Sequence, residues 1–262
     1  MLTEPPPTPL DLNFRLGRIP VRVSIWFWVG SAFLGWSWLQ VGGFPFLLIW
    51  IACVFVCILM HELGHVLMGQ VFGARSHIVL YHLGGLAVGA SNVYNRWKRI
   101  AVLLAGPGIQ LICYGLVWAG LKYEIIPIHD LNRYVFVALI MLQWINLWWP
   151  ILNLLPIWPL DGGQISRELF TWGSPSNGVR YSLILSIATA ALLAINGLVT
   201  EIRHEPLLDF LPATGRFSIV FFALFAVMNF LELQQENARR SHWHEPDDRL
   251  PWESDPDEWK RR

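Results

Sequence analysis

The chain has 262 residues, of which 54% are hydrophobic and only 15% carry a charge. This composition is far from that of an ordinary soluble domain and is typical of a protein that spans a membrane. Because the formal net charge is zero, the chain lacks the basic surface that nucleic acids require, and we expect no nucleic-acid partner.

Residues 1–20 are rich in proline and contain no long apolar core behind a basic start, so they do not resemble a cleavable signal peptide. We expect a short cytosolic tail that ends in Arg15, Arg18 and Arg22.

Six apolar segments follow this tail. A bilayer core of about 30 Å needs about 20 helical residues, so each segment is long enough, with its flanks, to cross it. The sequence therefore predicts an all-α polytopic membrane protein with six transmembrane helices. The segments are 23–40, 44–72, 99–121, 134–157, 180–200 and 217–232.

The distribution of Lys and Arg predicts the orientation of these spans. With the N-terminus inside, the inside segments hold 15 of the 19 Lys and Arg residues. Cytosolic loops carry such an excess of positive charge. We therefore expect a multi-pass protein of the cell membrane with both termini in the cytosol.

The second span contains His61-Glu62-Leu63-Gly64-His65. On a helix this spacing places both imidazoles on one face, one turn apart, where they can share a metal ion. Glu62 lies beside them as a candidate general base for hydrolysis. Ionisable groups are costly in hydrocarbon unless they have a partner or a function. We therefore favour a metal site over histidines that merely cap neighbouring backbone.

The loop after the second span has two strand-like runs, 77–83 and 86–90, around Gly84-Gly85. This pattern predicts a β-hairpin with a two-residue turn. The hairpin is too apolar for a free cytosolic loop, so we expect it to re-enter the membrane against the helices. In the third span, the small residues of Ala105-Gly106-Pro107-Gly108 predict close packing against a neighbouring helix.

The fourth span ends in a segment with three prolines, 150–159, followed by Asp161-Gly162-Gly163. Because proline interrupts a helix, we expect the backbone to unwind as it approaches Asp161, and the two glycines to let it turn there. Asp161 is the only charged residue between Arg133 and Arg167.

A catalytic zinc usually has three protein ligands, so His61 and His65 need a third. Asp161, Glu168, His77 and His82 are the candidates. At about 1.5 Å per residue, His61 lies about 26 Å from the outer end of the second span. This places it close to the cytosolic face, which the fourth span also reaches near Asp161. This common depth favours Asp161. Glu168 lies two turns further into the cytosolic loop, and the two histidines are expected at the aqueous interface.

Two motifs, His61–His65 and Asn153-Leu-Leu-Pro-Ile-Trp-Pro-Leu-Asp-Gly-Gly163, together resemble the paired signature of the site-2 protease family of intramembrane zinc metalloproteases. Gly84-Gly85, Ala105-Gly-Pro107 and Gly17-Arg-Ile-Pro-Val-Arg22 are similar to weaker features of the same family. The resemblance implies that Asp161 is the third zinc ligand and that Asn153 lies near the active site. The family often has Asn at the position of Gln110, so the resemblance does not imply a substrate-positioning role for Gln110 in this chain.

The resemblance implies a zinc-dependent intramembrane endopeptidase that binds one Zn²⁺ per chain through His61, His65 and Asp161, with Glu62 as the base. We expect it to cleave a transmembrane segment of a single-span membrane protein in the lipid bilayer, near the cytosolic face. The scissile segment must unwind first, and an edge strand of the hairpin can hold it extended. Gly84, Gly85 and Asn153 are the candidate substrate-binding residues.

A membrane metal-binding or transport protein that uses the same ligands is the alternative. Transporters usually have repeated halves with paired broken helices, and the other half of this chain has no second His/Glu motif. An inactive scaffold that binds membrane helices is a third hypothesis, which the presence of Glu62 disfavours.

The sequence thus predicts three parts: a cytosolic tail at 1–20, a six-span metalloprotease domain at 21–233, and a polar, flexible cytosolic tail at 234–262. No segment is long and soluble enough for a PDZ or a nucleotide-binding domain, which implies a minimal member of the family. The sequence specifies neither the substrate nor the oligomeric state.

Overall fold

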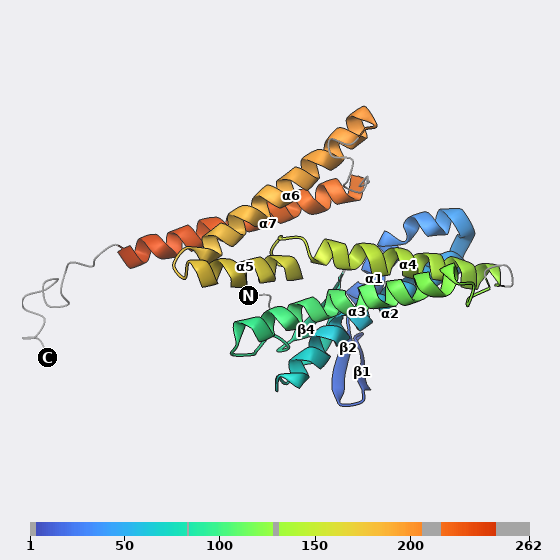
Figure 1. Cartoon of the computed structure of the whole chain (residues 1–262). Helices are drawn as coiled ribbons and strands as arrows, with labels where there is room; N and C mark the ends of the chain where they lie inside the picture. The colour runs from blue at the N-terminus through green and yellow to red at the C-terminus, as the bar shows by residue number, and fades with distance from the viewer. Residues whose placement is uncertain (1–3, 83, 128–130, 206–215, 245–262) are drawn as a thin grey trace, which may run out of the picture. The chain divides into compact units, whose positions relative to one another are not determined.

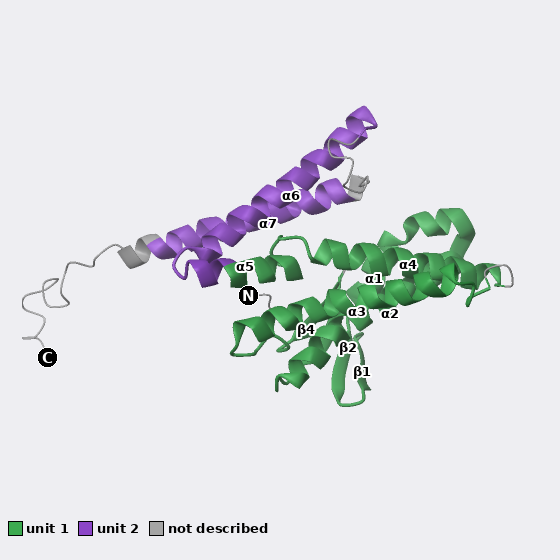
Figure 2. Ribbon diagram, in the orientation of Figure 1, with its two compact units in different colours: residues 1–169 green, residues 170–262 purple. Residues whose placement is uncertain are grey.

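The computed structural model of the chain describes residues 4–82, 84–127, 131–205 and 216–244. The chain divides into two compact units, residues 1–169 and 170–262 (Figure 2). The described residues are mostly helical, and one small sheet lies in the first unit (Figure 1).

The first unit contains, in chain order, β1 (Leu12–Leu16), β2 (Ile19–Val23), α1 (Ile25–Leu34), α2 (Trp36–Val71), β3 (His77–Tyr81), β4 (Gly84–Val88), α3 (Arg96–Lys122), α4 (Arg133–Asn153) and the start of α5 (Asp161–Gly173). The second unit contains the end of α5, α6 (Gly178–Arg203) and α7 (Arg216–His244). α6 and α7 pack along each other. α7 continues ten residues beyond Gln234, into the predicted tail, whose residues 245–262 lie outside the described part.

The four described strands form one sheet in the order β1-β2-β3-β4, so β4 lies at an edge. β1 pairs antiparallel with β2, β2 parallel with β3, and β3 antiparallel with β4. β1 and β2 were not predicted from the sequence, so the predicted all-α fold class with one hairpin leaves out half of the described sheet. Their short alternating runs turn at Gly17, where φ is +59°. The pairing that fixes them joins β2 to β3, more than 50 residues further along the chain.

The hairpin of β3 and β4 is present, but its turn lies two residues before the predicted one. Gly84 and Gly85 belong to β4, where they pair with Tyr81 and Leu80. The turn begins at His82, which adopts a φ of +47°. The predicted turn at Gly84-Gly85 is therefore wrong, and the two glycines serve contacts of β4 that are described below.

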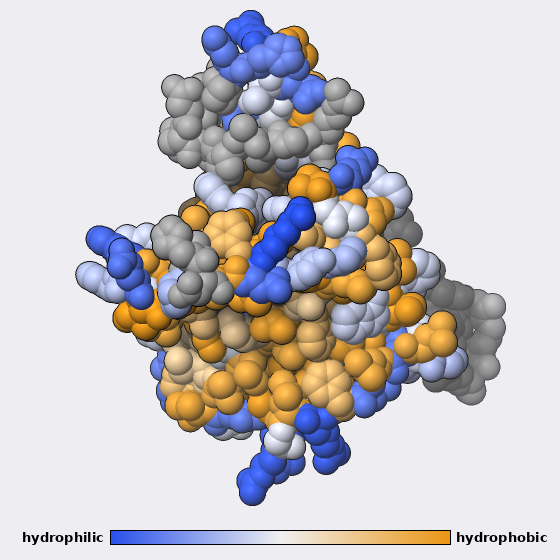
Figure 3. All heavy atoms as spheres, turned by 90° about the vertical axis from the view of Figure 1, so that its right-hand side faces the viewer, coloured by the Kyte–Doolittle hydropathy of each residue, from blue (hydrophilic) through white to orange (hydrophobic). Residues whose placement is uncertain are grey.

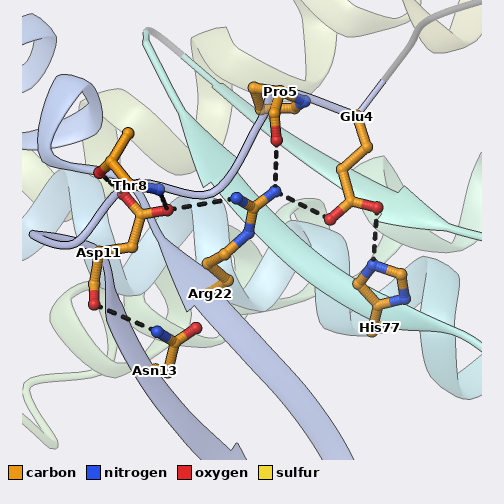
Figure 4. Close-up of polar contacts among 7 residues, drawn as sticks. All are labelled: Glu4, Pro5, Thr8, Asp11, Asn13, Arg22 and His77. Atoms are coloured by element: carbon orange, nitrogen blue, oxygen red, sulfur yellow. Dashed lines mark hydrogen bonds and ion pairs between the residues drawn. The ribbon is translucent and has the colours of Figure 1, made fainter.

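An ionic network ties the N-terminal segment to the sheet (Figure 4). Arg22 of β2 donates hydrogen bonds to the carboxylates of Glu4 and Asp11, at 2.8 and 3.2 Å, and to the carbonyl of Pro5 at 2.7 Å. Glu4 also pairs with His77 of β3 at 3.3 Å. Residues 4–11 thus lie against β2 and β3 through specific contacts.

Within the described residues, five helices are long and apolar enough to cross a membrane: α2, α3, α4, α6 and residues 218–240 of α7. The predicted first span, 23–40, is instead divided between α1, which has ten residues, and the beginning of α2. α2 itself is interrupted at Gly43, whose φ of +72° is not helical. Apolar side chains gather broadly on the face of the molecule seen in Figure 3, as expected of a surface that contacts lipid.

The core of the first unit forms where α2 packs against the sheet, α3 and α4. α2 and α3 approach closely, because a β-carbon on Gly64 would lie 2.5 Å from the carbonyl oxygen of Ala105. This confirms the close packing predicted for the small residues around Ala105. The buried hydrophobic residues include Val23, Phe27, Cys57, Ile58, Val66, Ile78, Leu80, Met141 and Ile145.

Candidate metal centre

Three buried side chains meet in the first unit: His61 and His65 of α2, and Asp161, the first residue of α5. The His61 Nε2 lies 3.1 Å from Asp161 Oδ2 and 3.1 Å from the His65 Nε2. The His65 Nε2 lies 3.3 Å from the same Asp161 oxygen. This is the only group of three or more His, Cys, Asp or Glu residues in the described part of the chain that could hold a metal ion.

Each histidine is oriented by a hydrogen bond on its other ring nitrogen. The His61 Nδ1–H donates to Gln110 Oε1 at 2.8 Å, and the His65 Nδ1–H donates to the carbonyl of Val102 at 2.7 Å. The Gln110 amide is fixed in turn, because its Nε2 donates to the carbonyl of Cys57 at 3.1 Å. Both histidines therefore turn their Nε2, the nitrogen that remains for a metal ion, toward Asp161.

Zinc fits this arrangement on two counts. Two imidazole nitrogens and a carboxylate oxygen converge on one point, and these are atom types that bind zinc in proteins. Ligands about 2.0–2.1 Å from a tetrahedral zinc lie about 3.3–3.4 Å from one another, close to the separations seen here. With three protein ligands, a tetrahedral ion keeps one position open, as catalytic zinc sites do.

Gly106 of α3 makes room for the second histidine. A β-carbon at Gly106 would lie 2.3 Å from the His65 Nε2, the atom that faces Asp161. The small residues of the third span therefore do more than bring two helices together, because one of them leaves space for the imidazole itself.

The local structure before Asp161 differs from the predicted one. α4 ends at Asn153, so the helix is broken as expected, but Gly162 and Gly163 belong to the first turn of α5 and are not a turn in the chain. β-Carbons on them would lie 2.1 Å from the Leu154 carbonyl oxygen and 2.4 Å from the Ile157 carbonyl carbon. The glycines let α5 begin directly against the preceding loop, which sets the position of Asp161.

Glu62 is buried beside the two histidines and in contact with β4. A β-carbon on Gly85 would lie 2.4 Å from Glu62 Cγ and 2.6 Å from Glu62 Oε1. The absence of a side chain at Gly85 therefore allows the carboxyl group to lie against the backbone of the edge strand.

The other candidate ligands are engaged elsewhere. His77 pairs with Glu4 at the outer part of the sheet. Glu168 accepts two hydrogen bonds from Arg99, at 2.8 and 2.7 Å. His82 occupies the hairpin turn. None of the three belongs to the metal-binding group found among the described residues.

Asn153 and Gly84 are both next to Trp149 of α4. The Asn153 Nδ2 donates to the Trp149 carbonyl at 3.0 Å, and a β-carbon on Gly84 would lie 3.9 Å from the Trp149 ring. The first residue of β4 and the last turn of α4 therefore lie close together, although among the described residues no hydrogen bond joins Asn153 to the three metal-binding side chains.

Gln110 is the functional residue that sequence reasoning missed. It is fully buried and connects His61 to the backbone one turn earlier on α2. A signal was present in the sequence: Gln110 is a polar side chain in an apolar span, four residues after Gly106, and such a group requires a partner inside the protein.

Comparisons with known proteins agree with this geometry. Residues 126–195 match Peptidase family M50, a segment that includes Asn153 and Asp161. The chain is 33% identical over 149 residues to a putative zinc metalloprotease of Synechocystis sp., over 55% of this chain and 38% of the relative. It is 31% identical over 145 residues to stage IV sporulation protein FB of Bacillus subtilis, over 54% of this chain and 47% of that protein.

The fold resembles that of a solved structure, the site-2 protease from Methanocaldococcus jannaschii, with a TM-score of 0.56 and 18% sequence identity over 86% of this chain and 94% of that one. The similarity to site-2 proteases inferred from the two motifs is thereby confirmed. The chain spans less than half the length of the curated relatives described above.

Proposed function

From this relationship to Peptidase family M50 and the geometry of the metal centre, we propose that the protein is a zinc-dependent intramembrane endopeptidase that cleaves a transmembrane segment of a membrane protein near the cytosolic face. The observation that carries the proposal is the convergence of two imidazole nitrogens and a carboxylate oxygen next to a buried glutamate that touches an edge strand.

His61, His65 and Asp161 would hold one zinc ion per chain, and their Nε2 and Oδ2 atoms are already at tetrahedral spacing. When bound, zinc supplies a Lewis acid that acidifies water and polarises a carbonyl oxygen. Gln110 and the Val102 carbonyl keep both imidazoles in the ligating tautomer. Glu62 then accepts the proton of the attacking water on its carboxylate and delivers it to the leaving amine.

The substrate in this proposal is a single-span membrane protein whose helix unwinds at the scissile bond. An intact helix uses its backbone groups internally, so it presents none to a protease. β4 lies at the edge of the sheet, and an extended segment can add to it as a fifth strand. Gly85 lets that strand lie against Glu62, and Gly84 lies beside Trp149, so both glycines are candidate substrate-binding residues. The amide oxygen of Asn153 is our candidate acceptor for a substrate N–H.

We further propose six spans with both termini in the cytosol of a cell-membrane protein. The short helix α1 and residues 36–42 of α2 together cover the predicted first span, and the five long helices supply the others. In this topology the hairpin of β3 and β4 lies on the cytosolic side and re-enters the membrane, where α2 covers it.

The test uses the purified protein and a membrane-embedded single-span reporter. Glu62→Gln should retain zinc and lose cleavage by about 10²-fold or more, because only the proton transfer is removed. Asp161→Asn should lose zinc, measured by atomic emission. Treatment with a chelator should abolish cleavage, and added zinc should restore it. Wild-type cleavage by Glu62→Gln would reject Glu62 as the base, whereas bound zinc without any cleavage by the wild type would favour a metal-binding or transport protein.

A further inference from the structure

The two glycines of the edge strand β4 face different helices of the first unit. A β-carbon on Gly85 would lie 2.4 Å from the Glu62 Cγ of α2, whereas one on Gly84 would lie 3.9 Å from the Trp149 ring of α4. Successive side chains of a strand point to opposite faces, which accounts for this difference. The proposed general base therefore lies on one face of β4, and Trp149 lies on the other.

The same alternation applies to a substrate that adds to β4 as a further strand. The substrate residue opposite Gly85 points its side chain to the face where Glu62 lies, because residues opposite each other share a face. The next residue of the substrate is opposite Gly84, and its side chain points to the Trp149 face. This holds for a parallel and for an antiparallel substrate. The residue opposite Gly84 is thus at the scissile bond or directly beside it.

Gly84 leaves room on the Trp149 face. Among the described residues, its chain neighbours aside, the Trp149 Cζ2 is the only atom within 4 Å of a β-carbon at this position. On the inner side of the sheet, Gly84 pairs with Tyr81 of β3, whose side chain is therefore on the same face. The β-carbons of such a pair are about 4.5–5.5 Å apart. The empty position is thus flanked by one aromatic side chain from β3 and another from α4.

Both aromatic side chains are held by contacts of their own. Trp149 packs against the core of the first unit and is half-buried. Tyr81 is also half-buried, and its ring contacts that of His82, with the centroids 5.3 Å apart. Neither ring occupies the space that a side chain at Gly84 would take, so this space is open to a side chain from another strand.

The chemistry of this position favours a large apolar side chain. A glycine in an edge strand is stabilised when an aromatic side chain of the neighbouring strand covers it. A phenylalanine or leucine opposite Gly84 would fill the room that the glycine leaves and bury apolar surface against the indole. An alanine or glycine there would leave the space without partner atoms and forfeit those contacts.

We propose that Trp149 is a specificity-determining residue of a substrate subsite over Gly84, which accepts an aromatic or large aliphatic side chain at or beside the scissile bond. The inference rests on the proposed function and adds a substrate class to it: single-span proteins with such a residue at one position of the cleaved segment. A tryptophan that only packed α4 against the core would affect all substrates alike, and the experiment separates the two roles.

The experiment uses the purified full-length protein and single-span reporters that differ at one residue. Phe, Leu, Ala or Gly is placed in turn at each position near the cleavage site, which mass spectrometry locates. At one position, wild type should cleave the Phe reporter with a kcat/KM about tenfold above that of the Ala reporter. Trp149→Ala should abolish this preference without changing those at the two adjacent positions, whose side chains face α2. Trp149→Phe should keep part of it.

Gly84→Ala is the complementary variant, because its methyl group takes up the room that the substrate side chain would fill. It should shift the preference at the same position from Phe toward Ala and Gly. Trp118→Ala is the matched control: this exposed tryptophan lies near the end of α3, and its replacement should leave the wild-type preference intact.

Three outcomes would overturn the proposal. The first is equal kcat/KM for the Phe and Ala reporters in wild type at every position. The second is an unchanged preference in a Trp149→Ala protein that retains zinc. The third is a loss in Trp149→Ala by the same factor for every reporter, which would assign Trp149 to packing alone. Failure of the proposed function is distinguishable, because it would appear as bound zinc without cleavage of any reporter by the wild type.

Discussion

Gly85 of β4 lies so close to Glu62 of α2 that a β-carbon at residue 85 would come within 2.4 Å of the glutamate Cγ. The sheet and the helix that carries the metal-binding histidines therefore meet at the proposed general base. A side chain at residue 85 would compete with the carboxyl group for space, so the position of the edge strand and that of the base are linked.

Replacing Gly85 by alanine should separate proton transfer from metal binding. Glu62 is buried, so the added methyl group must displace its carboxyl group or shift β4. We expect Gly85→Ala to retain zinc, because it touches none of the three ligands, and to lose about 10²-fold in kcat. Gly84→Ala tests the fold of the strand: its nearest neighbour would be 3.9 Å away, so zinc content and Tm should be unchanged. If Gly85→Ala kept the wild-type kcat, proton transfer by Glu62 would not depend on the absence of a side chain at residue 85.

Two glycines of α3 offer a matched pair for the metal centre. A β-carbon on Gly106 would lie 2.3 Å from the His65 Nε2, whereas one on Gly108 would meet nothing within 4 Å. Gly106→Ala should therefore lose bound zinc, and Gly108→Ala should retain it and gain stability, since alanine is favoured over glycine in a helix by about 1 kcal/mol. Atomic emission and thermal unfolding measure the two effects. Equal zinc content in both variants would contradict the position given to His65.

The parts of the site that could be predicted are those set by local spacing or by depth in the membrane. His61 and His65 share a helix face whatever surrounds the helix, and Asp161 could be matched to them because two spans ending at the same face bring their ends to one level. The contacts of Gln110 and Gly106 depend on how α3 is rotated against α2, which no local pattern specifies.

The sheet was harder to predict for the same reason. β1 and β2 are short, and they are fixed by a parallel pairing with β3 and by the contacts of Arg22, which bridge segments that are far apart in the sequence. The glycines of β4 suggested a turn because glycine is common in turns. Their observed role is close approach to Glu62 and Trp149, and only the packed structure reveals it.

The N-terminal segment should detach in acid through Asp11. Hydrogen bonds from the hydroxyl and amide of Thr8, together with Arg22, lower the pKa of Asp11 below its usual 3.8. A lowered pKa stabilises the folded state at pH values above the unfolded pKa, and the contribution is lost as the pH falls through the folded pKa. Asp11→Asn should therefore release residues 4–23 to pepsin faster than wild type at about pH 4, and the two rates should converge as the pH falls through the folded pKa of Asp11. A rate ratio that does not change with pH would exclude Asp11 as the cause.

The last prediction concerns Gln110, which accepts the His61 Nδ1–H and donates to the Cys57 carbonyl. Loss of such a partner of a metal-bound histidine typically costs 10–100-fold in metal affinity. Gln110→Leu should therefore raise the zinc Kd by about that factor, measured by competition with a chelator. Gln110→Glu keeps the acceptor oxygen and should bind zinc at least as tightly as wild type, even though it loses the bond to Cys57. If Gln110 acted only by filling space, the leucine variant would bind zinc as well as wild type does, and the role assigned to the amide would be wrong.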